Sequence, residues 1–150
     1  MGETCQQALR VGFDSAIKLE FHGAKVSSDA GLFPFRDLDE AAQLTESSAT
    51  ELFDFRTGTN IRHAMTALLR QSIYSRLAGY EDVNDAERLR VDPVMRHVVG
   101  GRAVDRDAAS TSQGARFETD VLCHPDNLDA LMDTPVRLSQ AENLSILITL

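Results

Sequence analysis

Hydrophobic side chains recur at helical spacing along most of this chain, and the clearest pattern covers residues 61–78. There, Met65 and two leucines share one face with two isoleucines, whereas Arg70 and Tyr74 lie on the opposite, polar face. This periodicity predicts an amphipathic helix that buries one face. Gly79 follows directly and is a typical helix end, because glycine readily adopts a left-handed conformation.

Two further capped helices are predicted within residues 79–101. Asn84 is a suitable N-cap for a helix over residues 85–90. Asp92 is a second N-cap, and Pro93 after it occupies the first helical position, where its missing N–H removes no hydrogen bond. A methionine and three valines then fall on one face, and a glycine pair ends this helix.

The N-terminal third predicts one strand and one helix. Apolar and polar residues alternate over residues 17–22, which is the period of a half-buried strand. A helix is expected from about Asp29 to Leu44, and it should start late or kink because Pro34 lacks a backbone donor. The residues expected on its buried side are Leu32, Phe35, Leu38 and Ala42. The acidic residues expected on its solvated side are Asp37, Asp39 and Glu40.

The C-terminal third predicts two more helices after an irregular polar connection at residues 102–107. Residues 108–112 offer several N-caps for a helix from about Ser112 to Leu122, whose aromatic residue should face the core. Pro125 opens a last short helix. Taken together, the patterns predict a mainly α fold, a bundle of short helices with a short N-terminal β-strand.

Composition narrows the class of protein. The chain has 150 residues, enough for one domain with a proper core. Cys5 and Cys123 are far apart and read as reduced thiols. No signal peptide is visible, and the apolar run at residues 144–150 is too short to span a bilayer. We therefore expect a cytoplasmic protein without a membrane partner.

The net charge of −8 is unevenly distributed. Residues 1–55 carry 4 basic and 10 acidic side chains, and residues 117–150 carry 1 and 6. Residues 56–116 carry 10 basic and 7 acidic side chains, and all ten of these basic residues are arginine. Arginine suits bidentate contacts with phosphate and guanine. Arginines interleaved with acids on helices are equally often solvated ion pairs, so both interpretations stay open.

The block at residues 79–101 reads GYEDVNDAERLRVDPVMRHVVGG, and it resembles the N-terminal region of bacterial insertion-sequence DDE transposases (transposase DDE domain group 1). Three other stretches resemble the same family. They are LEFHGAKVSSDAGLFPFRDLDEA at 19–41, RTGTNIRHAMTALLRQSIYSRLAGYEDVNDAERL at 56–89, and AASTSQGARFETDVL at 108–122. Together they extend the resemblance over residues 17–134.

The resemblance has consequences for domain organisation and catalysis. In the family, an RNase H-like catalytic domain with three metal-binding carboxylates lies downstream, so we expect neither that domain nor any catalytic or metal-binding residue in this chain. Mg²⁺ is implied only for the full-length family member, and no cofactor is expected here. Residues 1–14 are expected to be a loosely ordered N-terminus, and residues 15–134 the helical transposase domain. Residues 135–150 are expected to be a divergent tail, as a frameshift or broken gene copy would produce.

The resemblance also implies that this region grips the terminal inverted repeats of its element, close to the nucleoid. Short helices joined by glycine turns, with arginines on exposed faces, are compatible with helix-turn-helix-like reading of a duplex, although helical bundles share these features. A transposase oligomer is a further partner that the resemblance leaves open. The candidate DNA-binding residues are Arg70, Arg88, Arg90, Arg96, Arg102, Arg106 and Arg116.

Two alternatives to DNA binding remain at the level of sequence. The chain could pair with full-length transposase and inhibit it, using apolar faces near Met65 and Val98, or it could be a relic without function. Enzyme chemistry within the chain is not supported. Its three clustered acids take ordinary helix-start positions, and the adjacent Cys123 and His124 lack an orienting third group. The clustered acids are Asp82, Asp85 and Glu87.

Overall fold

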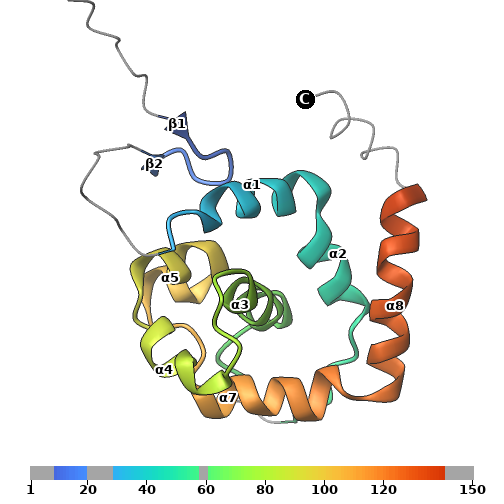
Figure 1. Cartoon of the computed structure of the whole chain (residues 1–150). Coiled ribbons are helices and arrows are strands. Elements are labelled where there is room, and N and C mark those ends of the chain that lie inside the picture. The colour runs from blue at the N-terminus through green and yellow to red at the C-terminus, as the bar shows by residue number, and fades with distance from the viewer. Residues whose placement is uncertain (1–8, 20–28, 58–60, 141–150) are drawn as a thin grey trace, which may run out of the picture.

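The computed structural model describes residues 9–19, 29–57 and 61–140, and within them the chain is mainly helical, as predicted (Figure 1). Two strands of two residues each, β1 (Leu9–Arg10) and β2 (Lys18–Leu19), pair antiparallel. β2 falls within the strand predicted over residues 17–22, of which residues 20–22 lie outside the described ranges, as do residues 1–8.

The helices follow one another closely along the chain. In order they are α1 (Leu32–Ala42), α2 (Leu44–Glu51), α3 (Met65–Leu77), the 3-10 turn η1 (Val83–Asp85), α4 (Ala86–Leu89), α5 (Pro93–Val99), α6 (Arg102–Asp105), α7 (Thr111–Arg116), the π-helical segment η2 (Phe117–Leu122) and α8 (Pro125–Gln140).

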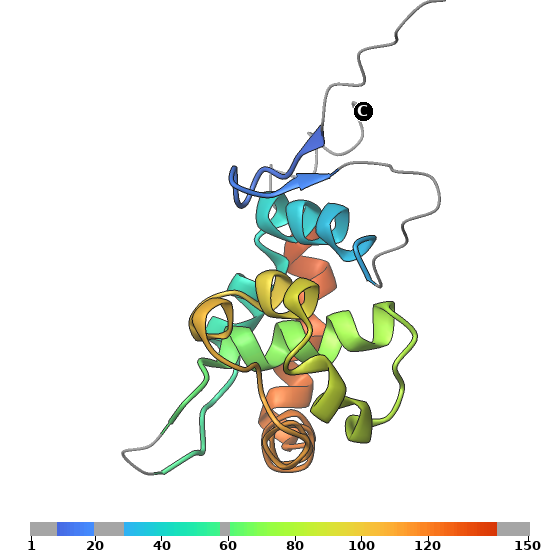
Figure 2. The same cartoon turned by 90° about the vertical axis from the view of Figure 1, so that its left-hand side faces the viewer.

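Helix α3 lies in the middle, and the other helices form a ring around it (Figure 1, and from the side in Figure 2). Because it is surrounded, α3 is buried on more than one side. Gln71 and Tyr74, predicted on a polar surface, are only 6% and 2% exposed. The predicted polar face is therefore wrong. The Gln71 side-chain amide instead exchanges two hydrogen bonds of 2.8 Å with the backbone of Ala109.

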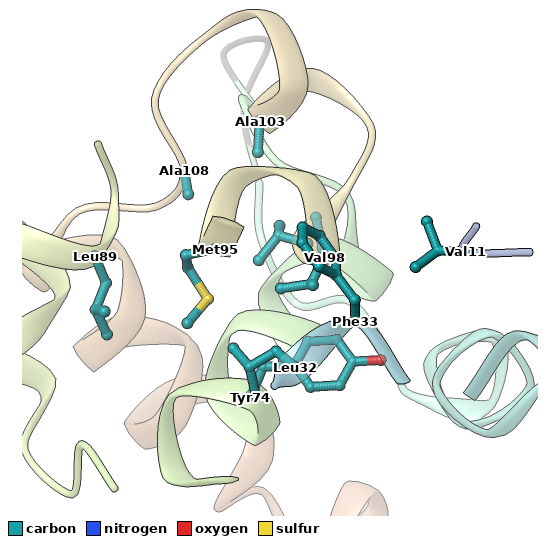
Figure 3. Close-up of a cluster of buried hydrophobic side chains, with 11 residues drawn as sticks. Val11, Leu32, Phe33, Tyr74, Leu89, Met95, Val98, Ala103 and Ala108 are labelled. Carbon is teal, nitrogen blue, oxygen red and sulfur yellow. The ribbon is translucent and has the colours of Figure 1, made fainter. Parts of the chain in front are cut away.

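One hydrophobic cluster fills the space between α3, α5 and α1 (Figure 3). Met95 and Val98 of α5 are 0% exposed, and Tyr74 of α3 is among their neighbours in the cluster. The predicted cap is confirmed, since Asp92 Oδ1 accepts the Met95 N–H at 2.8 Å. Gly100, with φ 76°, ends the helix. Burying each such side chain stabilises the fold by roughly 1.5–3 kcal/mol.

A second hydrophobic cluster packs on the other side of α3, against α2 and η2. Leu68 and Leu69 of α3 meet Phe117 and Val121 of η2 there. The predicted helix that contains η2 is confirmed, and it begins one residue earlier, at Thr111, with a capping box at Ser110.

A buried asparagine fastens the last helix to a distant loop. Asn127, 1% exposed, accepts the Phe53 N–H at 2.7 Å and donates to the Phe53 carbonyl at 3.0 Å. It also donates to the Val121 carbonyl at 2.9 Å. The two bonds to Phe53 join residues that are 74 positions apart in the sequence.

Helix α1 differs from its prediction in orientation. It begins at Leu32, so Pro34 lies in the first turn, where no intrahelical hydrogen bond is lost. Phe35 and Leu38, expected inside, are 49% and 44% exposed, whereas Asp39 is buried. Two charged residues of the helix, Arg36 and Asp39, are buried together with Leu32, which is buried as predicted.

Four other local predictions are corrected by the structure. Helix α2 was not predicted, and α6 replaces the irregular connection expected at residues 102–107. Asn84 does not cap a helix; its backbone N–H donates to Asp82 at 2.9 Å, and η1 precedes α4. Helix α8 is longer than expected, with 16 residues, and continues through Pro135.

Candidate nucleic-acid interface

The arginines of residues 56–116 differ in what their guanidinium groups contact. Two predicted DNA-binding residues, Arg70 and Arg96, are held within the protein. Arg70 Nε donates to Thr45 Oγ1 at 2.9 Å, and its side chain is 11% exposed. Arg96 donates to two carbonyls of α6 at 2.8 and 2.7 Å and so joins α5 to α6.

Arg70 belongs to a buried polar cluster centred on Asp39. Asp39 Oδ2 accepts the hydroxyl protons of Thr45 at 2.6 Å and Tyr74 at 2.7 Å. It lies 3.5 Å from Arg70 Nε and 3.7 Å from a guanidinium nitrogen of Arg36. Burial, together with the Asp39 hydrogen bond and charge, raises the pKa of Tyr74 far above its usual value. The solvated position predicted for Asp39 is therefore wrong.

Asp37 also has a structural partner rather than a purely solvated position. Its Oδ1 accepts the N–H groups of Gly12 and Phe13 at 2.8 and 3.1 Å, which fastens the turn between β1 and β2 to α1. The Arg36 guanidinium lies over the Phe13 ring at 5.0 Å. Of the three acidic residues, Glu40 alone keeps an exposed position, where it pairs with Arg36.

Arg88 and Arg90 lie at the surface and have partners there. Arg88 stacks over the Tyr80 ring, 5.0 Å from its centroid, and donates to the Tyr80 hydroxyl. Arg90 pairs with Glu87 at 2.9 Å and with Asp107 at 3.1 Å. These contacts match the solvated ion-pair interpretation for Arg90, whereas Arg88 keeps its charge uncompensated by a carboxylate within the described residues.

The remaining candidates are exposed and, within the described ranges, make no hydrogen bond or ion pair through their guanidinium groups. Sequence reasoning missed a fourth arginine of this kind, which lies within the helix predicted over residues 61–78, whereas α3 begins only at Met65. We call this set the unpaired arginines: Arg62, Arg102, Arg106 and Arg116.

Three arginine charges converge on His63, which is 7% exposed. Burial lowers the pKa of His63, and the charges of Arg102, Arg56 and Arg62 lower it further. Arg56 is itself fixed by Asp54, with Nε and Nη2 hydrogen bonds of 2.7 and 2.6 Å. These bonds lower the pKa of Asp54. Arg56 also donates a hydrogen bond from Nη1 to the His63 carbonyl at 2.8 Å.

A cavity of about 410 Å³ lies beside His63. Arg62 and Arg116 both line it, one from the loop before α3 and the other from the end of α7. The loop segment that carries Arg56 projects away from the helices (Figure 2). The cavity is therefore where two unpaired arginines and a buried histidine meet.

The residues weighed for catalysis have structural contacts. Asp82 accepts the Asn84 N–H, which lowers the Asp82 pKa. Glu87 accepts the N–H at the start of α7 at 3.2 Å. Cys123 is exposed, and the His124 ring lies 4.0 Å from an aromatic ring. In residues 9–19, 29–57 and 61–140 there is no group of three or more histidine, cysteine or acidic side chains suited to a metal ion, so the divalent metal implied by the resemblance has no matching ligands there.

Comparison with known families assigns the chain to a family of transposases. A family model described as transposase DDE domain group 1 matches residues 9–140, and the chain belongs to that family. No curated protein and no solved structure matches the chain. The match continues through α8, beyond Thr134, where the resemblance seen in the sequence ended. Among the described helices, none is long and apolar enough to cross a membrane.

Proposed function

We propose that this chain is the DNA-binding N-terminal part of an insertion-sequence transposase and recognises the ends of its element during DNA transposition. Membership in the transposase family supports a transposase-related role. The observation that carries the proposal is the set of unpaired arginines, because an exposed guanidinium without a carboxylate partner is available to a phosphate. Cutting and rejoining of DNA would belong to the RNase H-like part of the full-length enzyme.

Local charge supports DNA binding better than the net charge of −8 suggests. Arg62 and Arg116 line one cavity, and the charges of Arg62 and Arg102 both act on His63. These three arginines therefore form one cationic patch. A patch of this kind attracts phosphates locally even on an acidic protein, because solution ions screen distant charges within about 10 Å.

We divide the seven sequence candidates into two groups by the contacts of their guanidinium groups. We propose Arg88, Arg102, Arg106 and Arg116 as DNA contacts and add Arg62. We assign Arg70, Arg90 and Arg96 to holding helices together, because each is already bonded to protein acceptors. Moving any of these three to a phosphate would leave a carboxylate or carbonyl group without its partner.

Fluorescence anisotropy on a duplex carrying the terminal inverted repeat of the element, with a scrambled duplex beside it, tests the proposal. Tighter binding to the repeat, with affinity falling as salt rises, is the expected result. Each phosphate contact removed by Arg102→Gln or Arg116→Gln should reduce the slope of log affinity against log salt by about 0.9.

Arg76→Gln is the matched control, since Arg76 is half exposed but already pairs with Glu118 at 2.9 Å. Its salt slope should stay close to that of the unmodified chain. Equal and negligible binding to both duplexes by a chain that unfolds cooperatively would refute DNA recognition.

A second candidate function is contact between transposase copies. Val98, at the face first considered for such contact, is 0% exposed within the core and unavailable. Helix α8 instead exposes Leu128, Met132 and Val136 at a four-residue spacing, with Met132 75% exposed. If this stripe joins two copies, sedimentation should show a dimer that Met132→Lys dissociates. A monomer at all concentrations would exclude this second function.

A further inference from the structure

The cavity beside His63 has the size and the walls of a small-molecule site. Its volume of about 410 Å³ falls within the roughly 300–1,000 Å³ of such pockets. Its apolar lining includes Leu68, Phe117 and Val121, which are almost fully buried in the second hydrophobic cluster, and Ile61, which is 48% exposed and provides the accessible apolar wall. A wall of this kind suits a flat, apolar face rather than an ion alone.

Polar groups at the cavity have unused hydrogen-bonding capacity. His63 is more than nine-tenths buried, and its ring has no hydrogen bond within the described part of the chain. Gln113 uses its oxygen to accept the Ser110 N–H at 3.0 Å, which leaves its amide N–H₂ for a ligand. Asp120 adds an acceptor on the same lining. Donors and acceptors therefore stand beside an apolar surface.

The mouth of the cavity is cationic. Arg62 and Arg116 line it without a carboxylate partner among the described residues. Arg56 also lines it but is neutralised by its bidentate pair with Asp54. A phosphate alone would not need the apolar wall, and an apolar ligand would not need two free guanidinium groups. A nucleotide satisfies both, since it joins a flat base to a phosphate.

We infer that this cavity binds one unstacked nucleotide of the DNA, with its base against Ile61 and its phosphate between Arg62 and Arg116. This inference rests on the proposed DNA-binding function and adds a site for an unpaired base to it. His63 and Gln113 offer hydrogen bonds to the base edge, as in proteins that read unpaired bases.

The test compares two duplexes that differ only by one unpaired 2-aminopurine, using anisotropy for affinity and the 2-aminopurine emission for its environment. The unmodified chain should bind the duplex with the unpaired base about tenfold more tightly. Thr57→Trp places an indole in the cavity from an exposed lining position and should abolish this preference while leaving affinity for the paired duplex within about twofold. Thermal unfolding of the variant verifies that it folds.

Arg106→Gln is the matched control, because Arg106 is exposed and unpaired but is not among the residues that line the cavity. It should weaken binding to both duplexes by the same factor and keep the preference. Equal binding of both duplexes by the unmodified chain overturns the nucleotide site and leaves DNA binding intact.

If neither duplex binds, the proposed function fails and the cavity is tested by itself. Deoxyadenosine monophosphate is then titrated into the chain, with inorganic phosphate in parallel, and the His63 ring signals are followed by NMR. Saturable shifts with the nucleotide, absent with phosphate and in Thr57→Trp, support the site. Absence of any shift, or equal shifts with inorganic phosphate, overturns it.

Discussion

Arg70, on the central helix α3, and Arg116, at the end of α7, show two uses of one residue type. On the side of α1, Arg70 is almost covered and shares the carboxylate of Asp39 with a second arginine. On the side of α7, Arg116 is exposed and makes no ion pair within the described ranges. The first arginine contributes to the fold, and the second is available to a ligand.

The difference between the two sides arises from where the acidic side chains point. Asp39 is directed into the protein, so burial makes its partners obligatory, because an unpaired buried charge is strongly destabilising. Around His63, the carboxylate of Asp54 compensates Arg56 and leaves the charges of Arg62 and Arg102 to the solvent. Arginine content alone therefore does not identify a binding surface.

Substitution of Asp39, which lies at the centre of the buried polar cluster, should reduce the stability of the protein more than the other changes below. Asp39→Ala leaves two arginines near a buried site without their carboxylate, and we expect the free energy of unfolding to fall by about 3–5 kcal/mol. Urea denaturation measures this loss. Asp105→Ala, at an exposed position, should stay within about 0.5 kcal/mol of the unmodified chain. A loss below about 1 kcal/mol for Asp39→Ala would show that the cluster is not essential to the fold.

A pair of arginine substitutions tests the comparison directly. Arg70→Ala should lower the free energy of unfolding by about 2–3 kcal/mol, because it removes hydrogen bonds between charged and buried groups. Arg116→Ala should change it by less than about 0.5 kcal/mol while weakening DNA binding. Denaturation and anisotropy on the same samples decide the matter. Equal stability losses would mean that the two sides do not differ as described.

A substitution of Tyr74 measures the contribution of one hydrogen bond to the buried cluster around Asp39. Tyr74→Phe keeps the ring in its cluster and removes only the 2.7 Å hydrogen bond to Asp39. We expect a loss of about 1–2 kcal/mol, as for other hydrogen bonds to a charged group. In an Asp39→Asn background the same substitution should have a smaller effect, and a double-mutant cycle measures this coupling. Additive losses would argue against a direct interaction.

The smallest expected effect is the contribution of His63 to the pH dependence of stability. The pKa of His63 is lower in the folded than in the unfolded chain, so protonation favours unfolding. Stability should therefore be complete above about pH 6.5, the unfolded-state pKa, and should fall as the pH drops toward the folded pKa. Denaturation at a series of pH values measures how the free energy of unfolding changes with pH. His63→Gln should remove the contribution of His63 to this change. An unchanged slope would mean that His63 does not titrate differently on folding.

The helix at residues 93–99 was predictable because its signals are local. Asp92 supplies a cap three residues from its partner, Pro93 fits the first turn, and Gly100 ends the helix. All of these act within one or two turns of the chain. Periodicity then places Met95 and its valine neighbours on one face, and that face is the one the structure buries.

The orientation of α1 was not predictable from periodicity. An apolar pattern gave Leu32, Phe35, Leu38 and Ala42 as the buried residues. Leu32 is buried, but Phe35 and Leu38 are exposed, and Asp39 is buried because its partners come from elsewhere. Thr45 lies 6 residues away and Tyr74 lies 35 residues away. Hydrogen bonds across such separations compensate the burial of charge, and a local pattern contains no trace of them.

The candidate site, like helix α1, was only partly predictable from the sequence. Arginine enrichment indicated a phosphate-binding region, but it could not tell Arg96, which bonds to two carbonyls, from Arg102, which does not. Arg62 and His63 were read as parts of a helix, whereas α3 begins at Met65 and leaves both on a loop beside the cavity. Element boundaries are the weakest part of such predictions, and here they decide which side chains line the site.

The hydrogen bonds between Asn127 and Phe53 have a consequence for folding during synthesis. Because these groups are 74 residues apart, the loop after α2 cannot take its final position during synthesis until the start of α8 has emerged from the ribosome. Until then, the segment that leads to Arg56 and the cavity has no anchor from Asn127. The anchor of the loop beside the site therefore comes from a residue that is synthesised well after the loop itself.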